Sequence, residues 1–263
     1  MTRPADVLAQ ARRVVLLVMA GQSNGEGRGL PVGPALDPPD PRILMWEWGT
    51  GRLATATVPL SSQRRQVGLS PATVAARCLV RDEPPGTVVV ILNAAVGASG
   101  LVADPPTGTW AVRTTSPHPH LFDALARVVP RVRVAVADAA PAAAVDVGML
   151  WHQGEADGGV ATKAYATAFD ELVAALRREL HLPGLPVVLG GLVPEAVDRH
   201  PELSTVRDAL AATPARLSHA AYVDGVRGGG GSAGPDDVFH YSRAGVQALG
   251  AAMCQELRLL VDR

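Results

Sequence analysis

Met19-Ala20-Gly21-Gln22-Ser23-Asn24-Gly25-Glu26-Gly27 is a glycine-rich stretch with one serine near its middle, and it begins where an apolar run, Val14 to Met19, ends. The run has the length and composition of a buried parallel strand. Glycines near Ser23 let the backbone turn sharply after the strand and leave room for a substrate beside the hydroxyl. The same residues also fit a tight turn with an ordinary serine, so the rest of the chain has to separate the two readings.

Four more apolar runs have the character of buried strands. They are residues 87–92, 145–150, 186–189 and 220–223. Helical patterns lie between and after them, at residues 71–79, 121–129 with a continuation beyond Pro130, 165–180 and 242–260. Five strands that alternate with helices predict one α/β domain over residues 1–263, with a five-stranded parallel sheet covered on both faces. Residues 42–48 fit either a short strand or an extended segment.

The charge balance argues against a polyanionic partner. Lys and Arg number 24 and Asp and Glu 25, and no long basic run appears. We therefore expect neither nucleic acid nor an anionic membrane as a partner, and a neutral small molecule or a carbohydrate as the substrate. The two cysteines, Cys78 and Cys254, have no Cys or His at metal-ligand spacing. They are predicted to be core residues rather than a disulfide or metal ligands.

Arg12-Arg13, followed by apolar residues up to Ala20, imitates a short secretory signal. Its apolar core is about seven residues long, at the bottom of the range for signal peptides, and its removal would take away the strand that delivers Ser23. We therefore interpret it as the first strand. No stretch approaches the about 20 apolar residues of a membrane span, and the predicted location is the cytoplasm. The glycine run 228–231 predicts a flexible loop.

Polar residues follow several of the predicted strands, where ligands bind in open α/β sheets. A serine hydroxyl becomes a nucleophile when a histidine takes its proton and a carboxylate orients that histidine. Asp237 and His240 are three residues apart, so one turn brings the carboxylate to Nδ1 and leaves Nε2 free for Ser23. Taken alone, this spacing also fits a surface turn. The clusters at or after strand ends are Ser23, Gly97, Gln153 with Glu155, and Asp237 with His240.

An acyl-transfer site also needs donors for the developing oxyanion. The backbone N–H groups of Ser23 and Gly97 and the side-chain amide of Gln153 are candidates, although Gly97 also fits a plain turn and Gln153 a polar strand end. Glu155 and Asp157 form an alternative carboxylate pair for glycosidic chemistry, which leaves Ser23 unexplained.

Two other residues are alternatives, one for the base and one for the carboxylate that orients it. His152 is a second candidate base, but the carboxylates within its sequence reach are Glu155 and Asp157, which lie across a glycine. Asp236 is a second candidate for the carboxylate that orients His240.

Three blocks together resemble the SGNH (GDSL-like) hydrolase superfamily, in particular its carbohydrate acetyl esterases, namely carbohydrate esterase family six and the sialate O-acetylesterase-like proteins. The blocks are Gly21-Gln22-Ser23-Asn24, Trp151-His152-Gln153-Gly154-Glu155-Ala156-Asp157 and Asp237-Val238-Phe239-His240. The resemblance implies a flavodoxin-like three-layer α/β/α sandwich and a serine esterase that needs no metal or other cofactor. It makes Ser23 the nucleophile, His240 the base and Asp237 its orienter. Gly97 and Gln153 complete the oxyanion hole with Ser23, and the supporting residues are Gln22, Asn24 and Glu155.

The predicted function is removal of a short acyl group, foremost acetyl, from a carbohydrate or glycosylated small molecule. The chain departs from its relatives at Gly25, where methionine is frequent, and at Ala98, where a second glycine is frequent; the first change alters the wall of the acyl pocket. An acyltransferase that uses the same site and a non-catalytic sugar-binding module are the alternatives. All four tryptophans fit either stacking on a sugar or burial in the core, namely Trp46, Trp48, Trp110 and Trp151.

Overall fold

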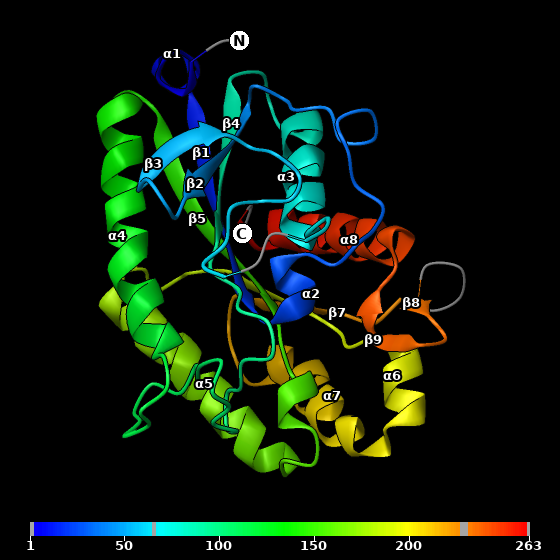
Figure 1. Cartoon of the computed structure of the whole chain (residues 1–263). Coiled ribbons are helices and arrows are strands. Elements are labelled where there is room, and N and C mark those ends of the chain that lie inside the picture. Colours follow the sequence, from blue (N-terminus) through cyan, green and yellow to red (C-terminus); the bar gives the residue numbers. More distant parts are fainter. Residues whose placement is uncertain (1–2, 65–66, 227–230, 262–263) are drawn as a thin grey trace.

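The computed structural model describes residues 3–64, 67–226 and 231–261, and within them the chain builds a seven-stranded sheet in the order β3-β2-β4-β1-β5-β6-β7 (Figure 1). The strands are β1 (Arg13–Gly21), β2 (Ile43–Glu47), β3 (Arg52–Thr55), β4 (Thr87–Asn93), β5 (Ala144–His152), β6 (Val187–Gly190) and β7 (Ala220–Val223). All neighbours pair in parallel except β2 and β3, which are antiparallel. A separate antiparallel hairpin consists of β8 (Ser232–Gly234) and β9 (Asp237–Tyr241).

Strand β1 occupies the middle of the sheet, and every residue from Val14 to Gly21 is buried. Such a continuous apolar run is typical of a parallel strand that is covered on both faces. In the pairing register, Met19 lies opposite Asn93 of β4 and Leu150 of β5. The carboxyl ends of these three strands therefore meet at one edge of the sheet, and the segments that follow them lie next to one another.

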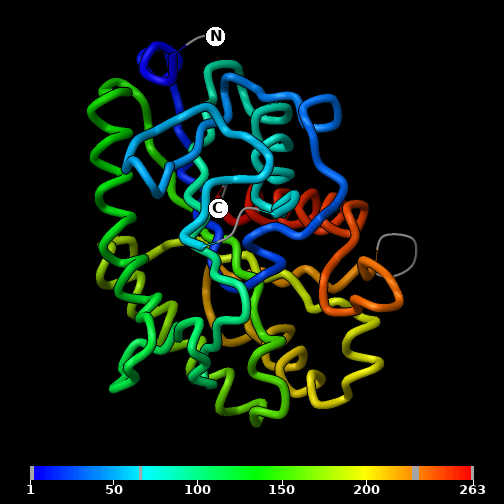
Figure 2. The backbone as a smooth tube through the Cα atoms, viewed as in Figure 1, coloured from blue at the N-terminus to red at the C-terminus, as the bar shows by residue number. Residues whose placement is uncertain are grey.

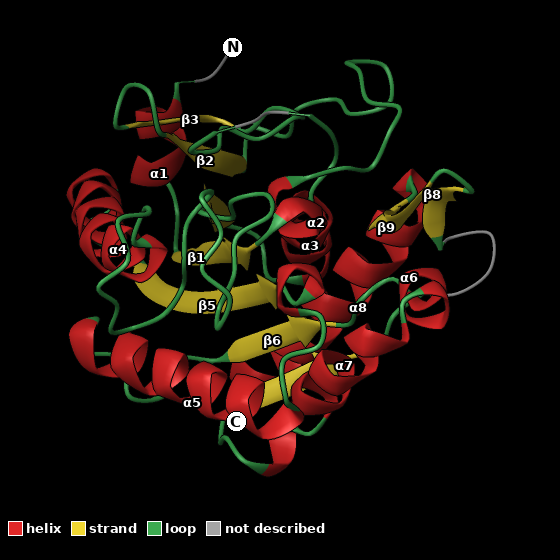
Figure 3. Cartoon of the chain, turned by 60° about the horizontal axis from the view of Figure 1, so that its bottom comes forward, coloured by secondary structure: helices red, strands yellow, loops and turns green. Residues whose placement is uncertain are grey.

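Helices cover both faces of the sheet, as Figure 3 shows. One face carries α3 (Pro71–Asp82) and α8 (Arg243–Val261), which lie side by side although they are far apart in the sequence (Figure 2). The opposite face carries α4 (Leu121–Ala139) and α5 (Thr162–Glu179). The remaining helical segments are α1 (Pro4–Ala9), α2 (Ser23–Glu26), η1 (Glu155–Asp157), α6 (Pro194–Arg199), η2 (Pro201–Leu203), α7 (Ser204–Ala211) and η3 (Thr213–Ala215).

The predicted fold class is confirmed, because the sheet between two helical layers is an α/β/α sandwich with parallel pairing at its centre. All five predicted strands are present, as β1, β4, β5, β6 and β7. The predicted number of strands was wrong, since β2 and β3 extend the sheet beyond β4. Strand β3 gave no signal in the sequence because it has only four residues and none of them is fully buried. The glycine run at 228–230 lies outside the described residues.

Several local predictions concern the core. Ser70 caps α3 by accepting a hydrogen bond from the Ala72 N–H, which is the role that its position before Pro71 indicated. Cys78 and Cys254 are free and buried, so their prediction as core residues is confirmed.

Among the described residues, no helix is both long and apolar enough to cross a membrane.

Candidate active site

A sharp turn after β1 delivers Ser23 to the edge of the sheet. Gly21 has a φ of +118°, and a Cβ atom on it would lie 2.0 Å from the carbonyl oxygen of His152. Only glycine fits both the conformation and the close approach of this neighbouring strand. Helix α2 then begins at Ser23 itself, so the serine stands where the strand becomes a helix. The predicted strand-to-helix elbow is present.

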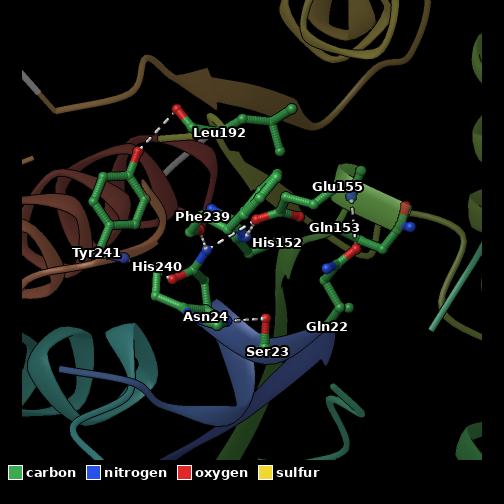
Figure 4. A network of polar contacts seen from close by, with 12 residues as sticks. Gln22, Ser23, Asn24, His152, Gln153, Glu155, Leu192, Phe239, His240 and Tyr241 are labelled. Carbon is green, nitrogen blue, oxygen red and sulfur yellow. Dashed lines mark hydrogen bonds and ion pairs between the residues drawn. The ribbon is translucent and has the colours of Figure 1, made fainter. Parts of the chain in front are cut away.

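The hairpin strand β9 brings a histidine and a carboxylate to this serine. His240 Nε2 lies 2.9 Å from Ser23 Oγ (Figure 4), and His240 Nδ1 lies 2.8 Å from Asp237 Oδ2. The other carboxylate oxygen, Oδ1, accepts the backbone N–H of His240 at 3.2 Å. One carboxylate therefore fixes both the ring and the backbone of the histidine. Ser23, His240 and Asp237 form one hydrogen-bonded chain, as the sequence predicted from their spacing and positions.

Asn24 connects the serine turn to the strand that carries His240. Its Oδ1 accepts the Tyr241 N–H at 3.0 Å, and its Nδ2 donates to the Phe239 carbonyl at 2.9 Å (Figure 4). Nδ2 also donates to Glu155 Oε1 at 2.9 Å. These three bonds use the oxygen and both hydrogens of the amide, and they fix β9 next to the turn after β1. These contacts fit the supporting roles expected of Asn24 and Glu155, which stay predictions.

Ser23 and Gly97 bring two backbone N–H groups to the lining of the cavity next to the serine hydroxyl. Gly97 and Ala98 line the cavity, and a Cβ on Gly97 would lie 3.7 Å from Ser23 Cβ. Within the described part of the chain, the N–H groups of Ser23 and Gly97 have no protein acceptor. Both donors therefore stay available for a substrate oxygen, and their place in an oxyanion hole stays a prediction that this geometry permits.

Gln153 lies where it cannot serve as the third donor. Its Nε2 donates to the Ser99 carbonyl at 3.1 Å and to Asp157 Oδ2, and its Oε1 accepts the Tyr165 hydroxyl at 2.7 Å. Burial, with the Asp157 carboxylate next in importance, raises the pKa of Tyr165, so that hydroxyl stays a donor and fixes the orientation of the amide. Gln153 is fully buried. Both amide hydrogens are used inside the protein, and the predicted oxyanion role of Gln153 is corrected.

Asp157 is a structural anchor, whereas the sequence analysis considered it only as one member of a carboxylate pair. Its Oδ1 accepts the N–H groups of Val102 and Ala103, and its Oδ2 accepts those of Leu101 and the Gln153 amide. The carboxylate is fully buried. It fixes the segment that follows Gly97, and its burial keeps it away from any glycosidic bond. The alternative of a carboxylate pair with Glu155 is therefore not supported by the geometry.

Replacing Asp157 with asparagine should destabilise the fold by about 3 kcal/mol, because the new NH2 group would face two N–H donors that lose their acceptor inside the core. Urea unfolding followed by circular dichroism measures this change. Asp104→Asn is the matched control, since Asp104 lies in the same segment, is exposed and accepts only the Ser116 hydroxyl. Equal stability of the two variants would contradict the anchoring role.

Within the described residues, His152 and Asp236, the alternatives for the base and for its orienting carboxylate, make no hydrogen bond to Ser23 or His240. His152 is fully buried, and its Nε2 lies 2.9 Å from the Gly191 carbonyl oxygen. It does not line the cavity that contains Ser23. Asp236 is exposed and, within residues 231–261, makes no hydrogen bond to His240. The geometry therefore favours His240 and Asp237 over both.

A cavity of about 660 Å³ opens above the serine. Its charged lining includes the Arg28–Glu26 ion pair, 2.7 Å between Nη2 and Oε2, and the exposed Arg64. Its aromatic wall is Phe239, which is 37% exposed and stacks on His200 with ring centroids 4.7 Å apart. None of the four tryptophans, all of which are described, lines this cavity. Trp46, Trp110 and Trp151 belong to the core, and Trp48 is half-buried.

A model of a protein family matches residues 13–258, and its description is carbohydrate esterase, sialic acid-specific acetylesterase. The chain belongs to this family of carbohydrate esterases. The resemblance noted from the three sequence blocks is thereby confirmed at this level, while the narrower assignment to carbohydrate esterase family six stays a prediction. No curated protein sequence matches the chain.

Solved structures agree with the fold of this carbohydrate esterase. A protein from Arabidopsis thaliana is 20% identical with a TM-score of 0.73, over 93% of this chain and 98% of that one. NanS is 19% identical with a TM-score of 0.72, over 96% of this chain and 99% of that one. A carbohydrate acetylesterase from Xanthomonas citri is 16% identical with a TM-score of 0.62, over 94% of this chain and 56% of that one. At these identities the likeness concerns the fold.

The cavity residues of this carbohydrate esterase that the sequence analysis gave no role include Arg28, Arg64, Thr107 and Phe239. Phe239 lies inside one of the three blocks, beside His240. The sequence did not show that its side chain is exposed and can line a cavity. Arg28 and Arg64 lie in loops without a motif, so nothing in their local sequence indicated the cavity. In the described residues, no group of three or more His, Cys, Asp or Glu side chains is placed to hold a metal ion.

Proposed function

We propose that the chain is a serine esterase that removes a short acyl group, foremost acetyl, from a hydroxyl of a carbohydrate or glycosylated small molecule. The observation that carries this proposal is the hydrogen-bonded chain from Asp237 through His240 to Ser23 at the base of an open cavity. Membership of a carbohydrate esterase family supports the ester bond as the target. This arrangement supports the roles of nucleophile, base and orienting carboxylate for the three residues.

The acyl-enzyme forms in two steps. Ser23 Oγ attacks the carbonyl carbon while its proton passes to His240 Nε2, and the carbonyl oxygen becomes an oxyanion near the N–H groups of Ser23 and Gly97. The tetrahedral intermediate then breaks its bond to the sugar oxygen, which takes the proton from His240. Asp237 stabilises the imidazolium between these steps. Acyl-Ser23 and the free sugar hydroxyl are the products.

Deacylation repeats this chemistry with water as the nucleophile. His240 takes a proton from water, the hydroxide oxygen bonds to the acyl carbon, and the bond to Ser23 Oγ breaks as His240 returns the proton to it. Acetic acid leaves, and it ionises in solution. The open cavity gives water a path to the acyl group.

Acetate release from a panel of acetylated sugars, with p-nitrophenyl acetate as a simple ester, tests the proposal. We expect release from at least one sugar ester, and a mass increase of one acetyl group on the peptide that contains Ser23 after rapid acid quenching. Folded protein that releases acetate from neither class of ester would contradict the proposal. Acetate release without labelling of Ser23 under single-turnover conditions would contradict the covalent step.

The cationic side of the cavity favours an acidic sugar, such as an acetylated sialic acid, as the first substrate to test. Arg64 lines the cavity and is exposed, and its guanidinium donates a hydrogen bond of 3.5 Å to the Thr107 carbonyl. Within the described residues, no carboxylate forms an ion pair with it. Arg28, by contrast, is held by Glu26 at 2.7 Å. Arg64 is therefore the side chain available for a carboxylate on the sugar.

Arg64→Gln should raise KM for an acetylated acidic sugar about tenfold, the equivalent of one charge-assisted hydrogen bond weakened by solvent. The kinetics with p-nitrophenyl acetate should stay the same, because that ester has no carboxylate. Steady-state kinetics on both esters measure the difference. Arg178→Gln, a change at an exposed arginine outside the cavity, serves as the control. An equal loss on both esters would count against recognition of the carboxylate.

A further inference from the structure

Gln22 carries a buried amide whose direction is fixed. The residue is 4% exposed, and its Oε1 accepts the N–H groups of Gly154 at 3.2 Å and Ala156 at 3.3 Å. Because the oxygen is held by two backbone donors, the NH2 group has to point the other way. Gln22 also lines the cavity that contains Ser23. The NH2 group is therefore presented to the cavity from the β5 side of the nucleophile.

This NH2 group has no protein partner. In the described residues, Gln22 Nε2 donates no hydrogen bond to a protein acceptor. The two neighbouring amides differ, because Asn24 and Gln153 donate both hydrogens to protein oxygens. Gln22 Nε2 is not among the buried side-chain atoms that lack a partner, so this donor is open to the cavity. An acceptor that arrives with the substrate can therefore reach it.

We propose that the side-chain amide of Gln22 is the third donor of the oxyanion hole, beside the N–H groups of Ser23 and Gly97. The proposal rests on the serine mechanism proposed above. It assigns to Gln22 the role that Gln153 cannot fill.

The position of His240 supports this assignment. The leaving sugar oxygen has to lie near His240, which protonates it, so the carbonyl oxygen has to point elsewhere. Figure 4 shows the amide of Gln22 and the ring of His240 on opposite sides of Ser23. The strand order β4-β1-β5 places the Gly97 segment on one side of the serine turn and the segment with Gly154 on the other. Donors from Gly97 and from Gln22 therefore converge over the nucleophile from two sides.

Gln22→Glu and Gln22→Met test the proposal. Both variants keep the length of the side chain, and the glutamate also keeps an acceptor for the Gly154 and Ala156 N–H groups. We expect kcat to fall about 100-fold in each, the usual effect of removing one oxyanion donor, with KM within about threefold of the wild type. The loss should be the same for sugar esters and p-nitrophenyl acetate, because an oxyanion forms on every ester.

The pH profile separates a donor from a packing role. In Gln22→Glu, the ratio of variant to wild-type kcat should rise as the pH falls towards the ordinary carboxyl range, about 4.3, because the protonated acid can donate a hydrogen bond. In Gln22→Met this ratio should stay constant with pH. Thermal melts show whether each variant is folded, and the methionine variant carries the test if the glutamate variant fails to fold.

The outcomes distinguish this proposal from the serine mechanism. An active wild type with unchanged kcat in both folded variants would overturn the role of Gln22 and leave the serine mechanism intact. A loss confined to sugar esters would also overturn it, because the amide would then bind a sugar hydroxyl. An inactive wild type would instead remove the proposed function on which the inference rests.

Discussion

Ser23→Ala should lower kcat/KM by about 10⁵-fold for every ester that the wild type hydrolyses, the scale of loss that removal of a triad nucleophile causes elsewhere. The hydroxyl is the atom that forms the acyl bond, and its hydrogen-bond partner is His240 Nε2 at 2.9 Å. Acetate release and p-nitrophenyl acetate hydrolysis measure the loss. His240→Ala should cost about as much, and the double variant little more than either, because residues that act as one unit are not additive.

Stability separates this result from unfolding. The Ser23 hydroxyl contributes one hydrogen bond, to a partly exposed histidine, so the thermal midpoint should shift by only a few degrees. Ser218→Ala, at an exposed serine, is the matched control and should keep the full rate. If the folded Ser23→Ala protein retained more than about one hundredth of the wild-type rate, covalent catalysis by Ser23 would be wrong.

The positions of the backbone elements were accessible from the sequence because each central strand is a long apolar run. Val14 to Met19 is buried throughout, so the run alone indicated a central parallel strand and a site at its carboxyl end. Gly97 follows β4, which pairs with β1, and the sequence predicted both strand ends. The edge strand β3 escaped because its four residues, Arg52–Thr55, are not fully buried and leave no continuous apolar pattern. Strand β7, at the other edge, was predicted.

The direction of single side chains was not accessible in the same way. Gln153 was correctly expected after β5, but its amide is oriented by Ser99, Asp157 and Tyr165, which come from three separate segments. Gln22 has the same side chain, and two backbone N–H groups after β5 turn its NH2 group towards the cavity. A motif gives the residue type at a position, whereas the donor that faces the substrate depends on partners that only the fold brings together.

The relation between Asp237 and His240 was predicted correctly because it is local. They are three positions apart in the sequence, and both lie in β9, where Oδ2 and Nδ1 are 2.8 Å apart. The expected contact is present, but the two residues lie in a strand and not in the single turn that their spacing suggested. Asp237 also keeps 48% of its side-chain surface exposed. A role in packing is therefore small, and a substitution there should affect the chemistry more than the fold.

Asp237→Asn should lower kcat/KM by about 10³- to 10⁴-fold, as it does for the carboxylate of other triads. The carboxylate accepts two hydrogen bonds, from the backbone N–H of His240 and from Nδ1. The backbone N–H requires an acceptor, so the amide oxygen of asparagine has to face it and the NH2 group has to face Nδ1. Nδ1 then becomes an acceptor, and the ring proton moves to Nε2. In that tautomer His240 cannot take the proton of Ser23.

Steady-state kinetics and urea unfolding on the same preparation test this argument. The free energy of unfolding should change by less than about 1 kcal/mol, because both partners of the lost interaction are partly exposed. Asp236→Asn is the matched control, one residue away and exposed, and it should keep the wild-type rate. A large loss in Asp236→Asn with a normal rate in Asp237→Asn would transfer the orienting role to Asp236. If Asp237→Asn lost activity only because it also lost stability, tautomer control would be contradicted. Asp157→Asn is the variant in which we expect a large loss of stability.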